Sequence, residues 1–177
     1  MRAARRLGII LTQWAIAASA SAGLLDDLRS VQPDEGLWVE ETVTSLPELP
    51  KQSTLVAVRL EGDARHEYFI DPRSLSVGRD GVVRFGLVVK TRGGTQQSSY
   101  AGVHCARQEW KTYAVAADDG KWRSVTKPSW KLIEKKRSDS MRLDLYRYYL
   151  CIGKTPVSPS ERILANLRRG LPPRSGR

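Results

Sequence analysis

The hydrophobic period of this 177-residue sequence changes near Trp130. Before that residue, apolar side chains either alternate with polar ones or form short runs rich in β-branched residues, which is typical of β-strands. After it, apolar side chains recur every three or four positions, which is typical of amphipathic helices. Strands first and helices last predict a domain of the α+β class.

Two segments carry the clearest strand patterns. Residues 54–60, TLVAVRL, are nearly all apolar or β-branched, which predicts a strand covered on both sides. In residues 82–91, VVRFGLVVKT, the odd positions are apolar from Val83 to Val89, whereas Arg84 and Lys90 have the other parity. This period of two predicts a half-buried strand.

Turn signals connect the strand segments. Asp80-Gly81 and Asp119-Gly120 each separate two strand-like stretches and predict hairpins. Residues 93–99, GGTQQSS, lack the lysine and the spacing of a phosphate-binding loop, so a flexible hairpin loop is expected there. An antiparallel meander is the simplest arrangement of these strands.

Two short helices are expected after the strands. The first lies within residues 138–151, and its apolar face comprises Met141, Leu145, Tyr148 and Cys151. The second lies within residues 158–170, with Ser158 as N-cap, Pro159 at the first helical position, Glu161 closing a capping box and Gly170 past the end. Its apolar stripe comprises Ile163, Leu164 and Leu167.

Residues 1–22 have the three regions of a secretory signal peptide: a basic start, an apolar run and small residues at Ala20 and Ala22. The apolar run from Leu7 to Ala18 is shorter than the roughly 20 residues that a membrane-spanning helix needs. We therefore expect a soluble periplasmic protein that is not an integral membrane protein. No cysteine lies at the cleavage boundary, so lipidation is not expected.

The domain boundaries follow from these patterns. Residues 1–22 are expected to be the signal peptide and residues 23–36 a flexible leader. A single α+β domain is expected over residues 37–170, and residues 171–177 are expected to form a basic tail.

The chain has two cysteines, Cys105 and Cys151. In a strand over residues 98–106, Cys105 shares its face with Ala101 and Val103, and Cys151 shares the apolar face of the first helix. Two inward-facing cysteines in an exported protein predict a disulfide that ties the sheet to the helix. A redox site would need closely spaced cysteines, and a metal site would need more ligands.

The net charge of +10 is concentrated at the C-terminal end of the chain. Residues 131–177 hold 12 basic and 4 acidic residues, whereas residues 23–130 hold 14 and 15. Such asymmetry indicates an anionic partner, and for an exported protein that is a lipid or glycan surface rather than nucleic acid. The candidate patch comprises Lys131, Lys135, Lys136, Arg137 and Arg142.

Aromatic residues lie close to this basic region in the sequence. The expected role of Trp110, Trp122 and Trp130 is packing in and around the core. The functional alternative is an aromatic surface on which sugar rings stack.

An ordered set of segments resembles the cryptic neisserial protein family, which comprises small exported proteins of proteobacteria. The segments are LWVEE at 37–41, the prolines from Pro47 to Pro50, YFIDPRSLSVGRDGVVRFGLVV at 68–89, SSYAGVHC at 98–105, YAVAADDGKW at 113–122, Trp130 and LYRYYLC at 145–151. The resemblance implies no specific activity. Relatives tend to have an acidic and a basic residue where this chain has Ala101 and His104, and some resemble lipoproteins.

No catalytic, metal or cofactor site is expected. His66 and His104 lie in strand-like segments without an H-x-x-H pattern, and Asp71 and Asp80 have turn positions. The sequence therefore predicts a non-enzymatic envelope protein that binds a partner protein, glycan or lipid surface through its basic C-terminal region and the neighbouring sheet. The alternative is a small periplasmic hydrolase that uses scattered acids and His104, and converging titratable groups in a pocket would favour it.

Overall fold

The computed structural model describes residues 38–60 and 65–170, and a compact unit begins at Val39. The expected signal peptide, the leader over 23–36 and the tail over 171–177 lie outside the described residues. The fold and the sites below are those of residues 39–170.

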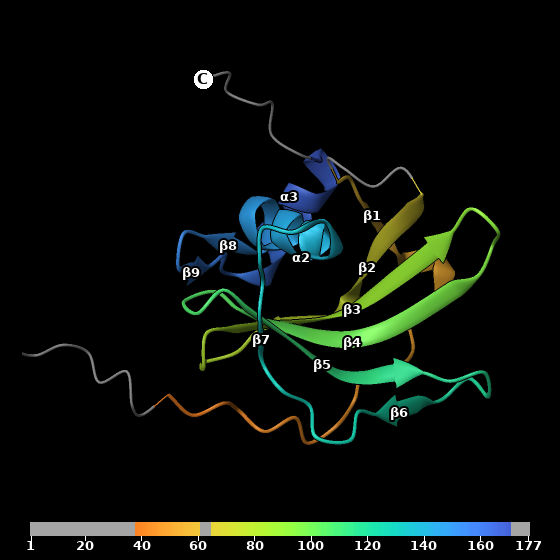
Figure 1. Ribbon diagram of the computed structural model, residues 1–177, viewed down its shortest axis with the longest axis horizontal. Helices are drawn as coiled ribbons and strands as arrows, with labels where there is room; N and C mark the ends of the chain where they lie inside the picture. The colour runs from red at the N-terminus through yellow and green to blue at the C-terminus, as the bar shows by residue number, and fades with distance from the viewer. Residues whose placement is uncertain (1–37, 61–64, 171–177) are drawn as a thin grey trace, which may run out of the picture. The chain divides into compact units, whose positions relative to one another are not determined.

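One antiparallel sheet dominates this unit (Figure 1). Strands β1 to β6 follow one another in sequence order, and β7 pairs with the start of β5. The strands are β1 (Val56–Val58), β2 (His66–Val77), β3 (Val82–Thr91), β4 (Gln96–His104), β5 (Glu109–Ala116), β6 (Trp122–Ser124) and β7 (Lys131–Leu132). The predicted meander is confirmed.

The Asp-Gly pairs form the turns predicted for them. Gly81 joins β2 to β3 with φ of 75°, and Gly120 joins β5 to β6 with φ of 70°, values that favour glycine. The predicted flexible loop over residues 93–99 is wrong in extent. The turn ends at Gly94, and Gln96 already pairs with Lys90 as the first residue of β4.

Strand β1 differs from its prediction as well. It pairs only with β2 and forms an edge of the sheet, and Ala57 is exposed there, so this strand is not covered on both sides. Its apolar sequence reflects packing of Val58 into the main core rather than burial of both faces.

The C-terminal part of the chain covers one face of the sheet. Short helical turns precede β1 and α2. The elements are η1 (Gln52–Thr54), η2 (Arg137–Asp139), α2 (Ser140–Asp144), the π-helical turn η3 (Leu145–Leu150), β8 (Cys151–Ile152), β9 (Thr155–Pro156) and α3 (Ser160–Arg169). The predicted α+β order, with helices after strands, is confirmed.

The π-helical turn changes which residues of the first helical segment are buried. The N–H of Cys151 donates to the carbonyl of Tyr146, five residues earlier, and this wider turn rotates the later side chains. Tyr148 is therefore only half-buried, and Cys151 lies in β8 instead of the helix. Met141, which precedes this turn, is half-buried as well. The buried side chains of η3 are Leu145, Tyr146, Tyr149 and Leu150.

Helix α3 begins two residues later than Ser158. Pro159 has the N-cap position and no side chain caps the helix, so the predicted capping box is wrong. Gly170 ends the helix with φ of 80°, as predicted. Ile163 and Leu167 are buried and Leu164 is half-buried against the core, which confirms the predicted stripe.

The main core lies between the sheet and these helical elements. Phe85 and Val103 from the sheet are fully buried there together with Leu145, Tyr149 and Ile163 from the helical layer. The odd positions of β3 face this core, as their period predicts.

The second face of the sheet is covered by residues 39–50, an extended segment that we call the strap (Figure 1). Val43 and Leu46 of the strap pack against Tyr100 and Tyr113 of the sheet. Strand β3 is therefore buried on both faces rather than half-buried, and even Arg84 is 5% exposed.

Candidate functional site

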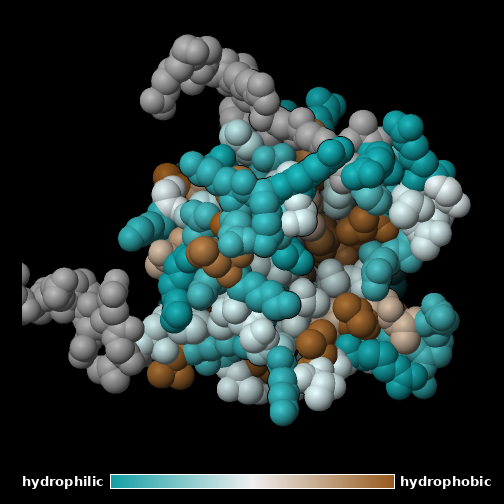
Figure 2. Space-filling model, in the orientation of Figure 1, coloured by the Kyte–Doolittle hydropathy of each residue, from teal (hydrophilic) through white to brown (hydrophobic). Residues whose placement is uncertain are grey.

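The sheet extends beyond α2, and the uncovered part of its main-core face forms a groove. Its volume is about 390 Å³, within the range of roughly 300–1,000 Å³ typical of small-molecule sites. Figure 2 shows a hollow on this side of the molecule with hydrophobic residues inside and hydrophilic residues around it. Strands β2 to β5 provide one wall, and Met141 and Arg142 of α2 provide the other.

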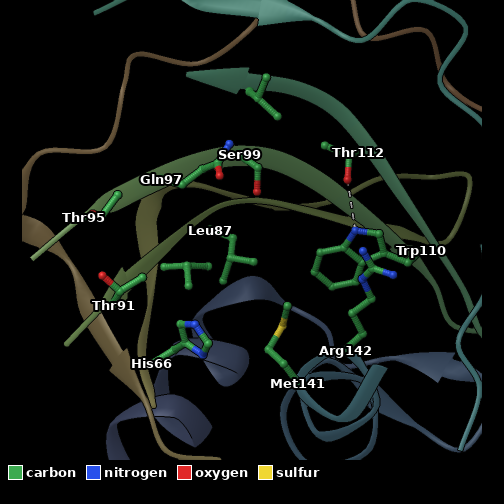
Figure 3. A pocket seen from close by; sticks show the side chains of 12 residues that line it. His66, Leu87, Thr91, Thr95, Gln97, Ser99, Trp110, Thr112, Met141 and Arg142 are labelled. Atoms are coloured by element: carbon green, nitrogen blue, oxygen red, sulfur yellow. Dashed lines mark hydrogen bonds between the residues drawn. The ribbon is translucent and has the colours of Figure 1, made fainter. Parts of the chain in front are cut away.

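The groove is apolar at its base and polar at its mouth. Leu87 and Trp110 are 3% and 4% exposed, and the side chains of Leu87 and Met141 point into the cavity from opposite sides (Figure 3). Thr91 and Gln97 lie at the exposed end, near the β3–β4 turn. The remaining lining residues are His66, Val89, Thr95, Ser99, Thr112, Val115 and Arg142.

Strand parity explains this lining. Register pairs place Leu87 opposite Ser99 and Val89 opposite Gln97, so these four side chains share the main-core face. Toward the β3–β4 turn the helices no longer cover this face, and the same parity that buries Val103 leaves Gln97 accessible. The groove is thus the open continuation of the core.

Arg142 closes one end of the groove, and its guanidinium is held from two sides. Its Nη1 donates to Asp139 Oδ1 at 3.1 Å, and its Cζ lies 5.4 Å from the centroid of the Trp110 ring. Asp139 is buried and also accepts the backbone N–H of Glu134 at 3.2 Å. Trp110 Nε1 donates to Thr112 Oγ1 at 3.2 Å, which fixes the indole.

Two further cavities adjoin the groove at His66. One of about 270 Å³ lies between this residue and β1, and one of about 330 Å³ is lined by Arg65, Glu67, Thr91 and Arg92. His66 lines all three cavities, and its ring lies 6.1 Å from that of Tyr68.

Titratable groups also converge on the strap side of the sheet. Glu40 accepts hydrogen bonds from Lys111 Nζ at 2.7 Å, the Tyr113 hydroxyl at 2.7 Å and Trp130 Nε1 at 3.0 Å. Burial alone would raise the pKa of Glu40, but these hydrogen bonds outweigh it and lower that pKa below its ordinary value. Burial raises the pKa of Tyr113, and the hydrogen bond that its hydroxyl donates to Glu40 raises it further.

A second ion pair lies beside this cluster. Arg84 donates from Nη1 to Asp80 Oδ1 at 3.1 Å and from Nη2 to the carbonyl of Glu41 at 3.1 Å. Burial opposes ionisation of Asp80, yet the hydrogen bonds from Arg84 and from backbone N–H groups prevail and lower its pKa. The charged residues of this network line none of the three cavities, so their evident role is to hold the strap on the sheet.

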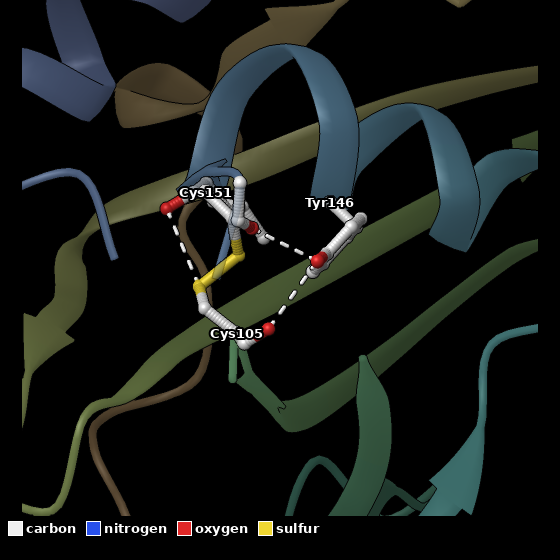
Figure 4. Close-up of a disulfide and its surroundings, with 5 residues drawn as sticks. Cys105, Tyr146 and Cys151 are labelled. Carbon is white, nitrogen blue, oxygen red and sulfur yellow. Dashed lines mark hydrogen bonds between the residues drawn. A yellow bond between two sulfur atoms is a disulfide. The ribbon is translucent and has the colours of Figure 1, made fainter. Parts of the chain in front are cut away.

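The predicted disulfide is confirmed. Cys105, just past β4, is bonded to Cys151 with a Cα–Cα distance of 5.7 Å (Figure 4). The Tyr146 hydroxyl donates to the carbonyl of Cys105 at 3.3 Å and lies 2.9 Å from that of Gly153. The bond therefore ties the sheet to the end of the helical segment, within the main core.

The predicted basic patch divides into two parts. Lys131, Lys135, Lys136 and Arg137 are exposed on the segment from β7 to η2. Arg142 instead lines the groove. Acidic neighbours offset part of the charge, because Lys136 forms ion pairs with Glu134 and Asp139.

The three tryptophans do not form one aromatic surface. Trp110 is buried in the main core, whereas Trp122 lies on the strap side, where its Nε1 donates to the Pro47 carbonyl at 2.7 Å. Trp130 is also tied to the strap, through Glu40. Trp110 therefore lies on the opposite face of the sheet from Trp122 and Trp130.

Positions 101 and 104 also lie on opposite faces. Ala101 is in the main core, and the ring of His104 lies 6.0 Å from that of Trp130 on the other side. Burial, followed by the charge of Arg107, lowers the pKa of His104. Side chains of an acid and a base at these two positions would not meet across the strand.

Among the described residues, no three or more histidine, cysteine, aspartate or glutamate side chains are grouped as metal ligands would be. The same part of the chain contains no helix that is both long and apolar enough to cross a membrane.

Comparison with known proteins identifies the family to which this chain belongs. Residues 34–168 match the CNP1-like family, so the chain belongs to that family, which confirms the resemblance seen in the sequence. No curated protein and no solved structure matches the chain.

Proposed function

We propose that this protein is an exported, non-enzymatic binding module and that its ligand site is the groove between the sheet and α2. The observation that carries the proposal is the polarity of that groove: an apolar base is joined to a polar mouth with a few convergent polar groups, as in small-molecule binding sites. Glu40 and Asp80 are instead engaged beneath the strap by Lys111, Tyr113 and Arg84, and neither carboxylate lines the groove.

The groove is also supported by rigid elements. Strands β3 and β4 form its base, Trp110 is fixed by Phe85 and Thr112, and the disulfide anchors the helical layer that provides the opposite wall. A preformed site of this kind binds a ligand without first ordering its own chain, so less of the interaction energy is lost.

Export is part of the same proposal. It is supported by the signal-peptide pattern of residues 1–22 and by the disulfide, because disulfides persist in oxidising compartments such as the periplasm. Contact with an anionic envelope surface is supported by the exposed cations Lys131, Lys135, Lys136 and Arg137.

The binding site is tested with a neutral fluorescent probe, N-phenyl-1-naphthylamine. We expect saturable fluorescence enhancement at one probe per chain, and loss of that enhancement in Gln97→Trp, which places an indole in the groove mouth. The matched control is Gln96→Trp. The side chain of Gln96 is exposed like that of Gln97, but it points to the opposite face of the sheet. Equal binding by the two variants, or no saturable binding by the unmodified protein, contradicts the proposal.

A further inference from the structure

We propose that the groove binds small carboxylates that carry an apolar chain, and that Arg142 binds the carboxylate. This inference rests on the proposed function, since it names the ligand class for the same groove. It concerns a free small molecule rather than a membrane surface, because the site is a cavity of about 390 Å³ between the sheet and a helix.

The charge of the lining is the first argument. None of the described residues that line the groove carries a carboxylate, whereas Arg142 brings a permanent positive charge to one end of it. The adjacent base is apolar, formed by Leu87, Val89 and Trp110. A positive charge beside such a surface attracts an anion more strongly than a charge in open solvent does.

The orientation of Arg142 is the second argument. Among the described residues, its hydrogen bond goes to Asp139 through Nη1, although a guanidinium has five N–H donors. The cation–π contact with Trp110 and the pairing with Asp139 position the guanidinium without using Nη2 or Nε. A fixed, planar fork of donors matches the two oxygens of a carboxylate.

Thr112 supplies a further donor at this end of the groove. Its Oγ1 accepts the hydrogen bond of Trp110 Nε1, so the position of this oxygen is fixed. A hydroxyl that accepts one hydrogen bond still has its own hydrogen to donate. A carboxylate at Arg142 therefore has a neutral donor as a neighbour on β5.

The apolar chain of the ligand would lie along the base of the groove. Leu87 and Val89 of β3 form this base, and Met141 of α2 faces them (Figure 3). Methionine adapts to irregular apolar shapes because its side chain is unbranched and polarisable. The groove then becomes polar at Gln97 and Thr91, which sets its outer limit.

Three eight-carbon ligands with different head groups test the assignment: octanoate, octan-1-ol and octylamine. Each competes with N-phenyl-1-naphthylamine for the unmodified protein. We expect octanoate to bind at least about tenfold more tightly than octan-1-ol, since a charge-assisted hydrogen bond contributes about 1.5–3 kcal/mol. Octylamine, whose head is cationic, is expected to bind most weakly.

Arg142→Gln is expected to reduce the ratio of the affinities for octanoate and octan-1-ol to about one, whereas Arg137→Gln is expected to leave that ratio unchanged. Arg142→Lys is expected to retain part of the preference, because the charge remains but the planar fork is lost. Arg137→Gln is the matched control, since it removes an exposed cation on η2 that lines none of the three cavities. If Arg142→Gln is poorly folded, Asp139→Asn with Arg142→Gln avoids leaving a buried carboxylate unpaired.

The outcomes separate this inference from the proposed function. Probe binding with equal affinities for octanoate and octan-1-ol, or an unchanged octanoate preference in Arg142→Gln, overturns the inference and leaves the binding function standing. Absence of saturable probe binding by the unmodified protein overturns both.

Discussion

Glu40 connects the strap to the sheet through three side-chain donors, so a single carboxylate secures a segment with no regular secondary structure of its own. Its side chain is 19% exposed and that of Lys111 is 13% exposed, so water screens this pair only partly. A buried acceptor that loses such partners weakens the fold more than an exposed ion pair does.

Glu40→Gln is therefore expected to lower the free energy of unfolding at pH 7 by about 1–3 kcal/mol. Because the pKa of Glu40 is lowered in the folded protein, its contribution is fully present above the unfolded value of about 4.3 and is lost as the pH falls through the folded value. The variant should thus lose less stability than the unmodified protein between about pH 5 and pH 3. Urea unfolding across this range measures both effects.

Glu48→Gln is the control for this prediction. Glu48 also pairs with two cations and also has a lowered pKa, from hydrogen bonds to Lys51 and then Arg73, but its side chain is 72% exposed. No measurable change in stability is expected for it. A Glu40→Gln protein as stable as the unmodified one at pH 7 would show that the remaining contacts of the strap, apolar and polar, suffice to hold it.

At the level of elements, strand parity was sufficient to predict the meander and the buried face of Cys105. The helical period failed to predict which side chains are buried where the backbone departs from a regular α-helix. The π-helical turn η3 buries Tyr146 and Leu150 in the core and leaves Tyr148 only half-buried, and no residue pattern in that segment predicts this turn. The sequence also did not predict that the strap covers the second face of the sheet, because a proline-rich extended segment has no periodic pattern that indicates its packing surface.

The disulfide joins two elements that also meet through side-chain packing and through the hydrogen bond that the Tyr146 hydroxyl donates to the carbonyl of Cys105. Cys105 and Cys151 are 46 positions apart, and closing a loop of this length stabilises a fold by roughly 4 kcal/mol in the chain-entropy model. Cys105→Ala with Cys151→Ala is expected to lose most of that free energy and to lower the melting temperature by many degrees. Denaturant unfolding under oxidising conditions measures the loss.

Reduction of the unmodified protein should reproduce the effect of the double substitution, while the double variant should not respond to reductant. An unchanged midpoint on reduction would mean that packing of Tyr149 and Leu150 suffices to hold the helical layer on the sheet.

Across the whole molecule, the groove was beyond prediction because it depends on how far the helical layer reaches over the sheet. Gln97 and Ser99 of β4 have the same parity as Val103, so their shared face could be read from the sequence. Which part of that face stays open is decided by a five-residue helix packing near Trp110, and this is a tertiary property. The basic patch was likewise divided by tertiary structure, which turned Arg142 toward the cavity.

The exposed cations of the basic patch lead to a prediction about binding to anionic envelope surfaces. If Lys135, Lys136 and Arg137 contact anionic lipid or glycan, co-sedimentation with anionic vesicles should weaken steeply as salt is raised. Changing all three residues to alanine should weaken it further. Arg142→Gln should have little effect here, because this residue lines the groove. Sedimentation that is absent, or independent of salt, would leave these cations as an ordinary solvated surface.

Export determines whether the disulfide forms in the native protein. Residues 1–22 carry a basic start, an apolar run and small residues in that order, so we expect the mature chain to begin at or near Gly23 in the periplasm. Oxidation follows translocation there, and the mass of the periplasmic species should equal that of residues 23–177 less two hydrogens for the Cys105–Cys151 bond. Intact-mass spectrometry of fractionated cells, with and without reductant, measures both. A cytosolic species that retains Met1 and two free thiols would contradict export and would place the protein where its disulfide is not maintained.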